Sequence, residues 1–166
     1  VDFDPGVGTA NLVSNGGFDI FIAKYDGNSN YLWAKGIGSP SDDFGNSLAT
    51  DASGNLLITG LFSDTADFDP GVGTANLASN GNFDIFIANY DANGNYLWAK
   101  GIGGSGTDDC QSITLDGSVD IYVTGSFQLT VDFDPGPGTA NLNSNGGSDI
   151  FFAKYDPFTT EVETLN

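Results

Sequence analysis

The sequence VDFDPG at residues 131–136 is the third copy of a motif that also begins at residues 1 and 66. The second copy has Ala66 in place of the valine, and successive copies start 65 residues apart. Each copy is followed by GTANL, by a Ser-Asn-Gly turn and by an apolar block of the form DIFIAKYD. Self-similarity at a fixed period of this size is typical of repeat proteins, in which each unit is one supersecondary structure.

The residue content and the spacing of turns indicate an all-β protein. The 166 residues include 24 glycines and 13 phenylalanines, and clusters of Asn, Asp and Ser separate short apolar runs that lack helical periodicity. The run Phe18–Tyr25 is apolar on both faces, which predicts a central strand that is buried from both sides. A hairpin turn follows at Asp26–Asn30. The returning strand carries Trp33, which we expect to anchor a core, as we do its repeat counterpart Trp98.

Each full period contains two strong hairpins and one or two short strands around DFDPG. We therefore predict antiparallel, four-stranded, blade-like repeats of 65 residues in a β-propeller-type fold. The alternative is an open, stacked β-array or solenoid that is completed between subunits. Residues 1–38 form a partial first repeat, 39–103 the second, and 104–166 a third with a divergent terminal strand, all in one continuous repeat domain. Because the chain begins without Met inside a repeat, we expect a processed product or a segment of a longer polypeptide.

The charge restricts the classes of partner. Four lysines, no arginine and 22 acidic residues give a net charge of −18. Nucleic acids and anionic membranes require a basic face, which four lysines do not make. No apolar run is long enough to insert into a bilayer. The absence of histidine and the single cysteine, Cys110, argue against zinc, haem and nucleophile–histidine sites, and one cysteine excludes an internal disulfide.

Paired aspartates in DFDPG are the candidate binding residues. The six residues are Asp2, Asp4, Asp67, Asp69, Asp132 and Asp134. Carboxylates two residues apart on a strand point to one face and repel one another unless a cation or a donor lies between them. A hard cation such as Ca²⁺, which could also take backbone carbonyls from the Pro-Gly turn, satisfies this geometry. The alternative is that these carboxylates accept N–H groups from the following turn.

No catalytic residue is predicted. Almost all acidic residues belong to the repeat, whereas an active site is usually a single departure from it. The acidic steps Asp42-Asp43 and Asp108-Asp109 come before a strand, where we expect them to cap turns. We therefore expect this protein not to be an enzyme.

Three segments carry a resemblance to a known family. The sequences DDFGNSLATDASGNLLITGLFS, TADFDPGVGTANL and DIFIANYDANGNYLWAKG resemble the SBBP-type β-propeller repeat, and the similarity extends to about Pro157. This repeat occurs in large, secreted bacterial surface proteins. The resemblance implies a β-propeller-like fold and an extracellular, non-catalytic setting at the bacterial cell surface, often beside adhesion or sorting modules.

The expected function is that of a non-catalytic structural repeat of an extracellular bacterial surface protein. A closed propeller usually needs at least about four blades, whereas this chain holds at most three, with incomplete ends. Open edges invite pairing with copies of the same chain, head to tail, in a filament or a ring. Neighbouring repeats of a longer chain, in a larger propeller, would cover the ends equally well. The alternative function is an adhesion module that binds a glycan or a protein.

Overall fold

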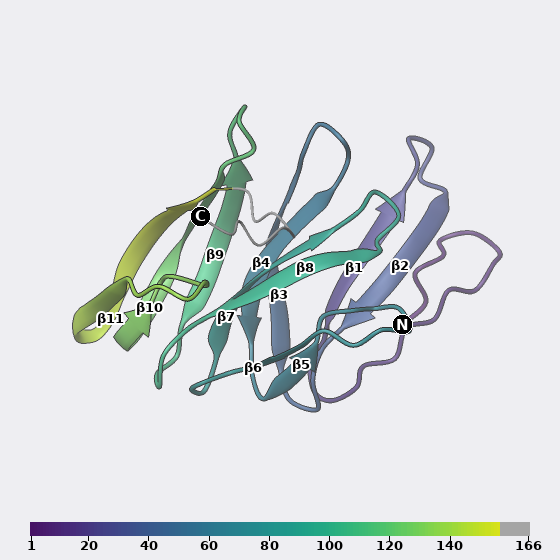
Figure 1. The fold of residues 1–166 in the computed structure, drawn as a ribbon. Helices are drawn as coiled ribbons and strands as arrows, with labels where there is room; N and C mark the ends of the chain where they lie inside the picture. The colour runs from purple at the N-terminus through teal and green to yellow at the C-terminus, as the bar shows by residue number, and fades with distance from the viewer. Residues whose placement is uncertain (157–166) are drawn as a thin grey trace.

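A computed structural model describes residues 1–156 of the chain. The expected divergent terminal strand lies outside the described residues. The described part contains strands and turns without a helix (Figure 1), so it holds no helix long and apolar enough to cross a membrane.

The strands form three main sheets and one small hairpin sheet. The central sheet contains β3 (Asp43–Thr50), β4 (Leu56–Phe62), β7 (Asp84–Tyr90) and β8 (Tyr96–Ile102). The other two main sheets contain β1 (Ile20–Tyr25) with β2 (Tyr31–Ile37), and β9 (Asp109–Leu115) with β10 (Ile121–Asp132) and β11 (Asn141–Tyr155). The small sheet contains β5 (Thr65–Asp67) and β6 (Asn76–Ala78).

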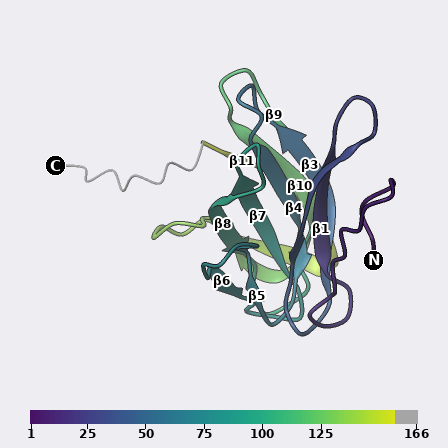
Figure 2. The same cartoon turned by 90° about the vertical axis from the view of Figure 1, so that its right-hand side faces the viewer.

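The central sheet is a complete antiparallel blade. Its strand order is β3-β4-β7-β8, and each strand pairs antiparallel with its neighbour. Between β4 and β7 the chain makes the β5–β6 hairpin, which contains the second DFDPG motif. Figure 2 shows this hairpin at the opposite end of the sheet from the turn between β3 and β4. The prediction of an all-β fold with antiparallel, four-stranded blades is confirmed.

Each flanking sheet is an incomplete copy of the central blade. Strands β1 and β2 lie one period before β7 and β8, and β9, β10 and β11 lie one period after β3, β4 and β7. Within the described residues, the first sheet therefore lacks the two strands that correspond to β3 and β4, and the third lacks the one that corresponds to β8. The three sheets form an open stack rather than a closed ring (Figure 1).

Apolar side chains fill both spaces between the sheets. One core cluster joins Ile20, Ile22 and Ile37 of the first sheet to Ile58, Phe86, Ala88 and Tyr90 of the central sheet. The other joins Leu57, Ile85, Ile87 and Ile102 of the central sheet to Cys110, Ile113, Ile121 and Val123 of the third. The central sheet is thus apolar on both faces, because it lies between two others.

The two tryptophans are half-buried at the edges of these clusters. Trp98 packs against the second cluster and Trp33 against the first. Gly94, in the turn between β7 and β8, lies so close to Trp33 that a β-carbon there would be 3.0 Å from the indole ring. The neighbouring Lys24 ammonium donates a 2.9 Å hydrogen bond to the carbonyl of Ala92 in the same turn. Trp33 therefore anchors one repeat to the next.

Burial on both faces holds for β7 but not for its counterparts at the ends of the stack. In β7, Ile85 and Ile87 are fully buried on one face and Phe86 is 1% exposed on the other. In β1, Ile20 and Ile22 are buried, but Phe21 is 61% exposed. The prediction for Phe18–Tyr25 is therefore wrong for the outer face of β1. The physical reason is that no sheet packs there among the described residues.

The phenylalanine of each DFDPG motif belongs to an aromatic cluster. Phe68 packs against Phe62 at 5.5 Å between ring centroids and against Phe86 at 5.0 Å. Phe133 makes the same two contacts with Phe127 and Phe151, at 5.4 and 4.7 Å. Each cluster ties a DFDPG loop to the two middle strands of its blade.

Replacing Phe86 by alanine is expected to lower the free energy of unfolding by about 3–5 kcal/mol, because the buried ring leaves a cavity between two sheets. Phe21→Ala is the matched control. It removes the same ring at the exposed repeat position, and we expect a loss of about 1 kcal/mol or less. Urea denaturation of both variants measures the difference. Equal losses would contradict the packing of the central blade.

Candidate functional site

The predicted aspartate pairs form a compact loop in all three repeats. Asp67 accepts hydrogen bonds at Oδ1 from the backbone N–H groups of Asp69 (3.0 Å) and Ala75 (2.8 Å). Asp69 accepts one from the N–H of Gly71 at 2.8 Å. The first aspartate of each pair therefore closes the hairpin, and the second caps the Pro-Gly turn.

The same contacts recur in the other two copies. Asp2 accepts from Asp4 and Ala10 at 3.1 and 2.8 Å, and Asp132 accepts from Asp134 and Ala140 at 3.0 and 2.7 Å. The second aspartates, Asp4 and Asp134, each accept from the following glycine N–H at 2.7 Å. The N–H groups lower the pKa of Asp2 and Asp132, with the Ala10 and Ala140 donors contributing most.

A glycine two residues beyond the Pro-Gly pair makes room for the second carboxylate. A β-carbon at Gly73 would lie 2.1 Å from Asp69 Oδ2, and at Gly8 and Gly138 it would lie 2.0 Å from the corresponding oxygens. Any other residue would displace the carboxylate from its turn. The pattern DFDPGxG is therefore explained by the hydrogen bonding and close packing of the loop itself.

Cation binding by the six aspartates stays a prediction. The contacts described above satisfy carboxylate oxygens with backbone donors, which is the alternative that the sequence left open. In residues 1–156, no group of three or more acidic or cysteine side chains is placed to hold a metal ion. A cation there would therefore have to take most of its ligands from backbone oxygens and water.

A second set of carboxylates is buried between the repeats. Asp43 accepts hydrogen bonds from the N–H groups of Ser39 (2.6 Å) and Ser63 (3.2 Å). One period later, Asp108 accepts from Gly104 (2.8 Å) and Gln128 (3.0 Å). Each carboxylate thus links two segments. One segment follows the last strand of a blade, and the other ends the second strand of the next blade. The expected turn caps are present, and burial raises the pKa of both side chains.

The aspartate that begins the DIF block was not singled out from the sequence. Asp84 is buried and accepts a 2.8 Å hydrogen bond at Oδ2 from the N–H of Asn80, and burial raises its pKa. A β-carbon at Gly103 would lie 2.3 Å from its Cγ. Asp19 and Asp149 accept from Asn15 and Asn145 in the same way. The sequence feature that could have identified this aspartate is that it recurs in all three copies, each time three residues after a Ser-Asn-Gly turn.

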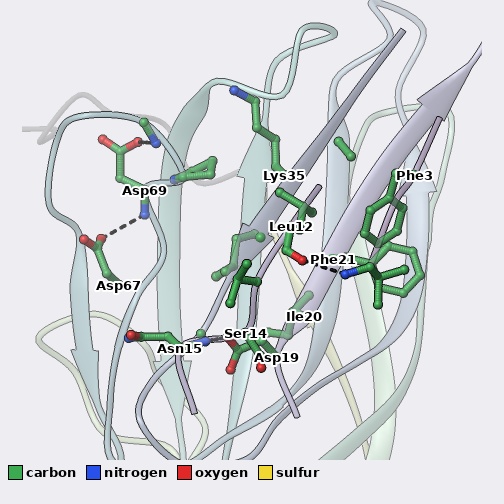
Figure 3. A pocket seen from close by; sticks show the side chains of 18 residues that line it. Phe3, Leu12, Ser14, Asn15, Asp19, Ile20, Phe21, Lys35, Asp67 and Asp69 are labelled. Carbon is green, nitrogen blue, oxygen red and sulfur yellow. Dashed lines mark hydrogen bonds between the residues drawn. The ribbon is translucent and has the colours of Figure 1, made fainter. Parts of the chain in front are cut away.

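A partly apolar, open pocket lies beside the first repeat. A pocket of about 560 Å³ is bounded by the first DFDPG hairpin, by β1 and β2, and by the second DFDPG loop (Figure 3). Phe3, Leu12, Ile20 and Phe21 form its apolar part, and Gly36 of β2 also lines it. Asp67 and Asp69 lie on the opposite side from Phe3 and Phe21 in the same figure.

Comparison with known proteins found one relative that is described as a WD repeat-containing protein. No family model matches the chain, so the resemblance to the SBBP-type repeat stays a prediction. The chain is 32% identical over 166 residues to an uncharacterized WD repeat-containing protein, L264, of Acanthamoeba polyphaga mimivirus, covering 91% of this chain and 12% of that protein. It is 25% identical over 137 residues to the regulatory protein FlaEY of Caulobacter vibrioides, covering 82% of this chain and 14% of that protein.

The chain therefore spans about an eighth of the length of the curated relatives that it matches. A WD-repeat relative agrees with the blade-like sheets of the structure, since WD repeats build four-stranded propeller blades.

The calcium prediction leads to a defined thermal response. If Ca²⁺ links the aspartate pairs, a chelator lowers the Tm of the protein, because removing a ligand that binds only the folded state removes its stabilisation. The variant Asp67→Asn with Asp69→Asn should respond less than the wild type. A matched control, Asp51→Asn with Asp91→Asn, changes two turn carboxylates and should keep the full response. An unchanged Tm of the wild type in chelator, measured by differential scanning fluorimetry, would rule out calcium.

Proposed function

We propose that this chain is a non-catalytic structural repeat of a β-propeller-type surface protein, and that its blades bind further copies of the chain head to tail. The observation that supports it is the exposure, at the two ends of the stack, of side chains that are buried in the middle. The division into repeats at residues 1–38, 39–103 and 104–166 belongs to the same proposal.

The C-terminal end of the stack presents an apolar face, which we call the tail face and define by Ile150 and Phe152 of β11. These side chains are 88% and 78% exposed. Their counterparts in β7, Ile85 and Ile87, are fully buried against the third sheet. The tail face is therefore apolar like the corresponding face of the central sheet, and that face packs against the next blade.

The N-terminal end presents the opposite face, which we call the head face and define by Phe21 and Tyr25 of β1. Both side chains are exposed. Their counterparts in β7, Phe86 and Tyr90, are buried in the cluster that contains Ile20 and Ile22. Inside the chain, a tail-type face thus packs against a head-type face at each junction.

The exposed tail face of one molecule therefore matches the exposed head face of another. Such a heterologous contact forms a ring if the rotation between blades closes and a filament if it does not. The net charge of −18 opposes association, so the contact should strengthen as salt screens the repulsion. In a longer polypeptide, neighbouring repeats would use the same two faces.

Three further observations support a non-catalytic role. The carboxylates of the repeat accept backbone hydrogen bonds, the buried ones join consecutive blades, and the chain is similar to a WD repeat-containing protein. The extracellular bacterial setting rests on the resemblance to the SBBP-type repeat. Surface labelling of intact cells that produce the full-length protein tests that part of the proposal.

The variant Ile150→Asp with Phe152→Asp is expected to weaken self-association at least about ten-fold, because it places two charges in the apolar contact. Sedimentation velocity over a range of protein and salt concentrations measures it. The matched control, Val7→Asp with Val72→Asp, adds the same charge at two fully exposed loop positions and should associate like the wild type. A wild type that stays monomeric at every concentration, or a tail-face variant that associates as strongly, would overturn head-to-tail stacking.

A further inference from the structure

We propose that a hard cation such as Ca²⁺ binds between two carboxylates at each junction between consecutive blades. The pairs are Asp84 with Asp108 at the second junction and Asp19 with Asp43 at the first. Both junctions lie inside the described residues, so the proposal depends neither on the ends of the chain nor on head-to-tail stacking. These four aspartates are distinct from the six of the DFDPG loops.

The first observation is a buried carboxylate oxygen without a hydrogen-bond donor. Asp84 is 1% exposed, and its Oδ2 accepts a hydrogen bond from the N–H of Asn80. Its Oδ1 is buried and accepts none from the described residues. One period earlier, Asp19 accepts the N–H of Asn15 at Oδ2, and its buried Oδ1 is again without a donor. Burying an ionised oxygen without a partner is costly, so its recurrence points to a positively charged partner.

The second observation is that another carboxylate lies beside each of these oxygens. A β-carbon at Gly103 would lie 2.6 Å from both side-chain oxygens of Asp84. The N–H of the next residue, Gly104, donates a 2.8 Å hydrogen bond to Asp108 Oδ2. The two carboxylates therefore flank one step of the backbone. Burial raises the pKa of Asp84, and the negative charge of Asp108 raises it further.

The first junction has the same arrangement. A β-carbon at Gly38 would lie 2.6 Å from Asp19 Oδ1, and the N–H of Ser39 donates a 2.6 Å hydrogen bond to Asp43 Oδ2. Burial raises the pKa of Asp43, and the charge of Asp19 raises it further. The loop after Gly38 begins Ser-Pro-Ser, whereas its counterpart at 104–106 reads Gly-Ser-Gly. The carboxylate pair is thus retained although the loop sequence differs.

Backbone donors favour the ionised form of the second carboxylate in each pair. Asp108 accepts an N–H group at each oxygen, from Gly104 at Oδ2 and from Gln128 at Oδ1. Burial raises the pKa of Asp108, and these two donors counteract the effect. A proton on either oxygen would displace an N–H group. Two neighbouring carboxylates in a junction of this kind are therefore better balanced by a cation than by a proton.

Backbone carbonyls and water would supply the remaining ligands, since residues 1–156 place no group of three acidic or cysteine side chains around a metal ion. The carbonyl oxygens of Gly104 and Gly106 lie close to the turn before Asp84. A β-carbon at Gly81 in that turn would lie 2.6 and 2.4 Å from them. Ca²⁺ accepts carboxylate, carbonyl and water oxygens in flexible geometry. The bound ion would cross-link consecutive blades.

Calorimetric titration of Ca²⁺ into the chelator-treated chain tests the proposal. The titration is run in about 0.15 M NaCl, which screens attraction to the acidic surface. The wild type is expected to bind at least two ions per chain. Asp84→Asn should bind one ion fewer, because a neutral amide replaces a charged ligand. Asp51→Asn, which changes a turn carboxylate, is the matched control and should bind as many ions as the wild type.

A second variant keeps the test valid if Asp84→Asn does not fold, which circular dichroism shows. Asp19→Asn changes the partly exposed member of the other pair and should also bind one ion fewer than the wild type. No binding of Ca²⁺, or an ion count that neither junction variant lowers, would overturn the proposal. A count that falls only in Asp67→Asn with Asp69→Asn would place calcium in the DFDPG loops and overturn it equally.

The outcome is separable from that of head-to-tail stacking. The tail-face variant, Ile150→Asp with Phe152→Asp, leaves both junctions unchanged and should bind as many ions as the wild type. If both proteins bind the ions but the wild type does not self-associate, the junction sites stand and stacking is wrong. If the wild type self-associates without binding Ca²⁺, stacking stands and the junction sites are wrong.

Discussion

Strand β7 is apolar on both faces, and the rest of the structure depends on the need to cover it. Burial of Ile85 and Ile87 requires a sheet on one side, and burial of Phe86 and Tyr90 requires one on the other. A single blade cannot provide both covers, so each repeat is stable only beside its neighbours. The exposed counterparts of these residues at the two ends of the stack follow from the same constraint.

The polar parts of the repeat position this apolar strand. Aspartates in the DFDPG loops and at the starts of strands accept N–H groups that would otherwise be unpaired, as Asp67 and Asp108 show. The loop then directs a phenylalanine against β7 or its counterpart, and the buried carboxylates join one blade to the next. The high acidic content is thus largely a property of turns and junctions, which leaves charge repulsion as a cost of the architecture.

Several features could be predicted from the sequence because they depend on local patterns. The period, the hairpin turns and the antiparallel blade follow from recurring Gly, Asn and Asp residues between apolar runs. The caps at Asp43 and Asp108 were expected for the same reason. The buried role of Asp84 could have been inferred from its recurrence, but its burial depends on the approach of Gly103, which is distant in sequence.

The sequence by itself determined the repeat, the strand type and the residues that each repeat contributes to the core. Only the tertiary structure decided which copies of those residues are buried, since Phe21 and Phe86 occupy the same position in nearly identical local sequences. The physical reason is that burial is a property of contacts between repeats. A periodic sequence specifies the two faces of every blade, but the number and order of blades decide which faces remain open.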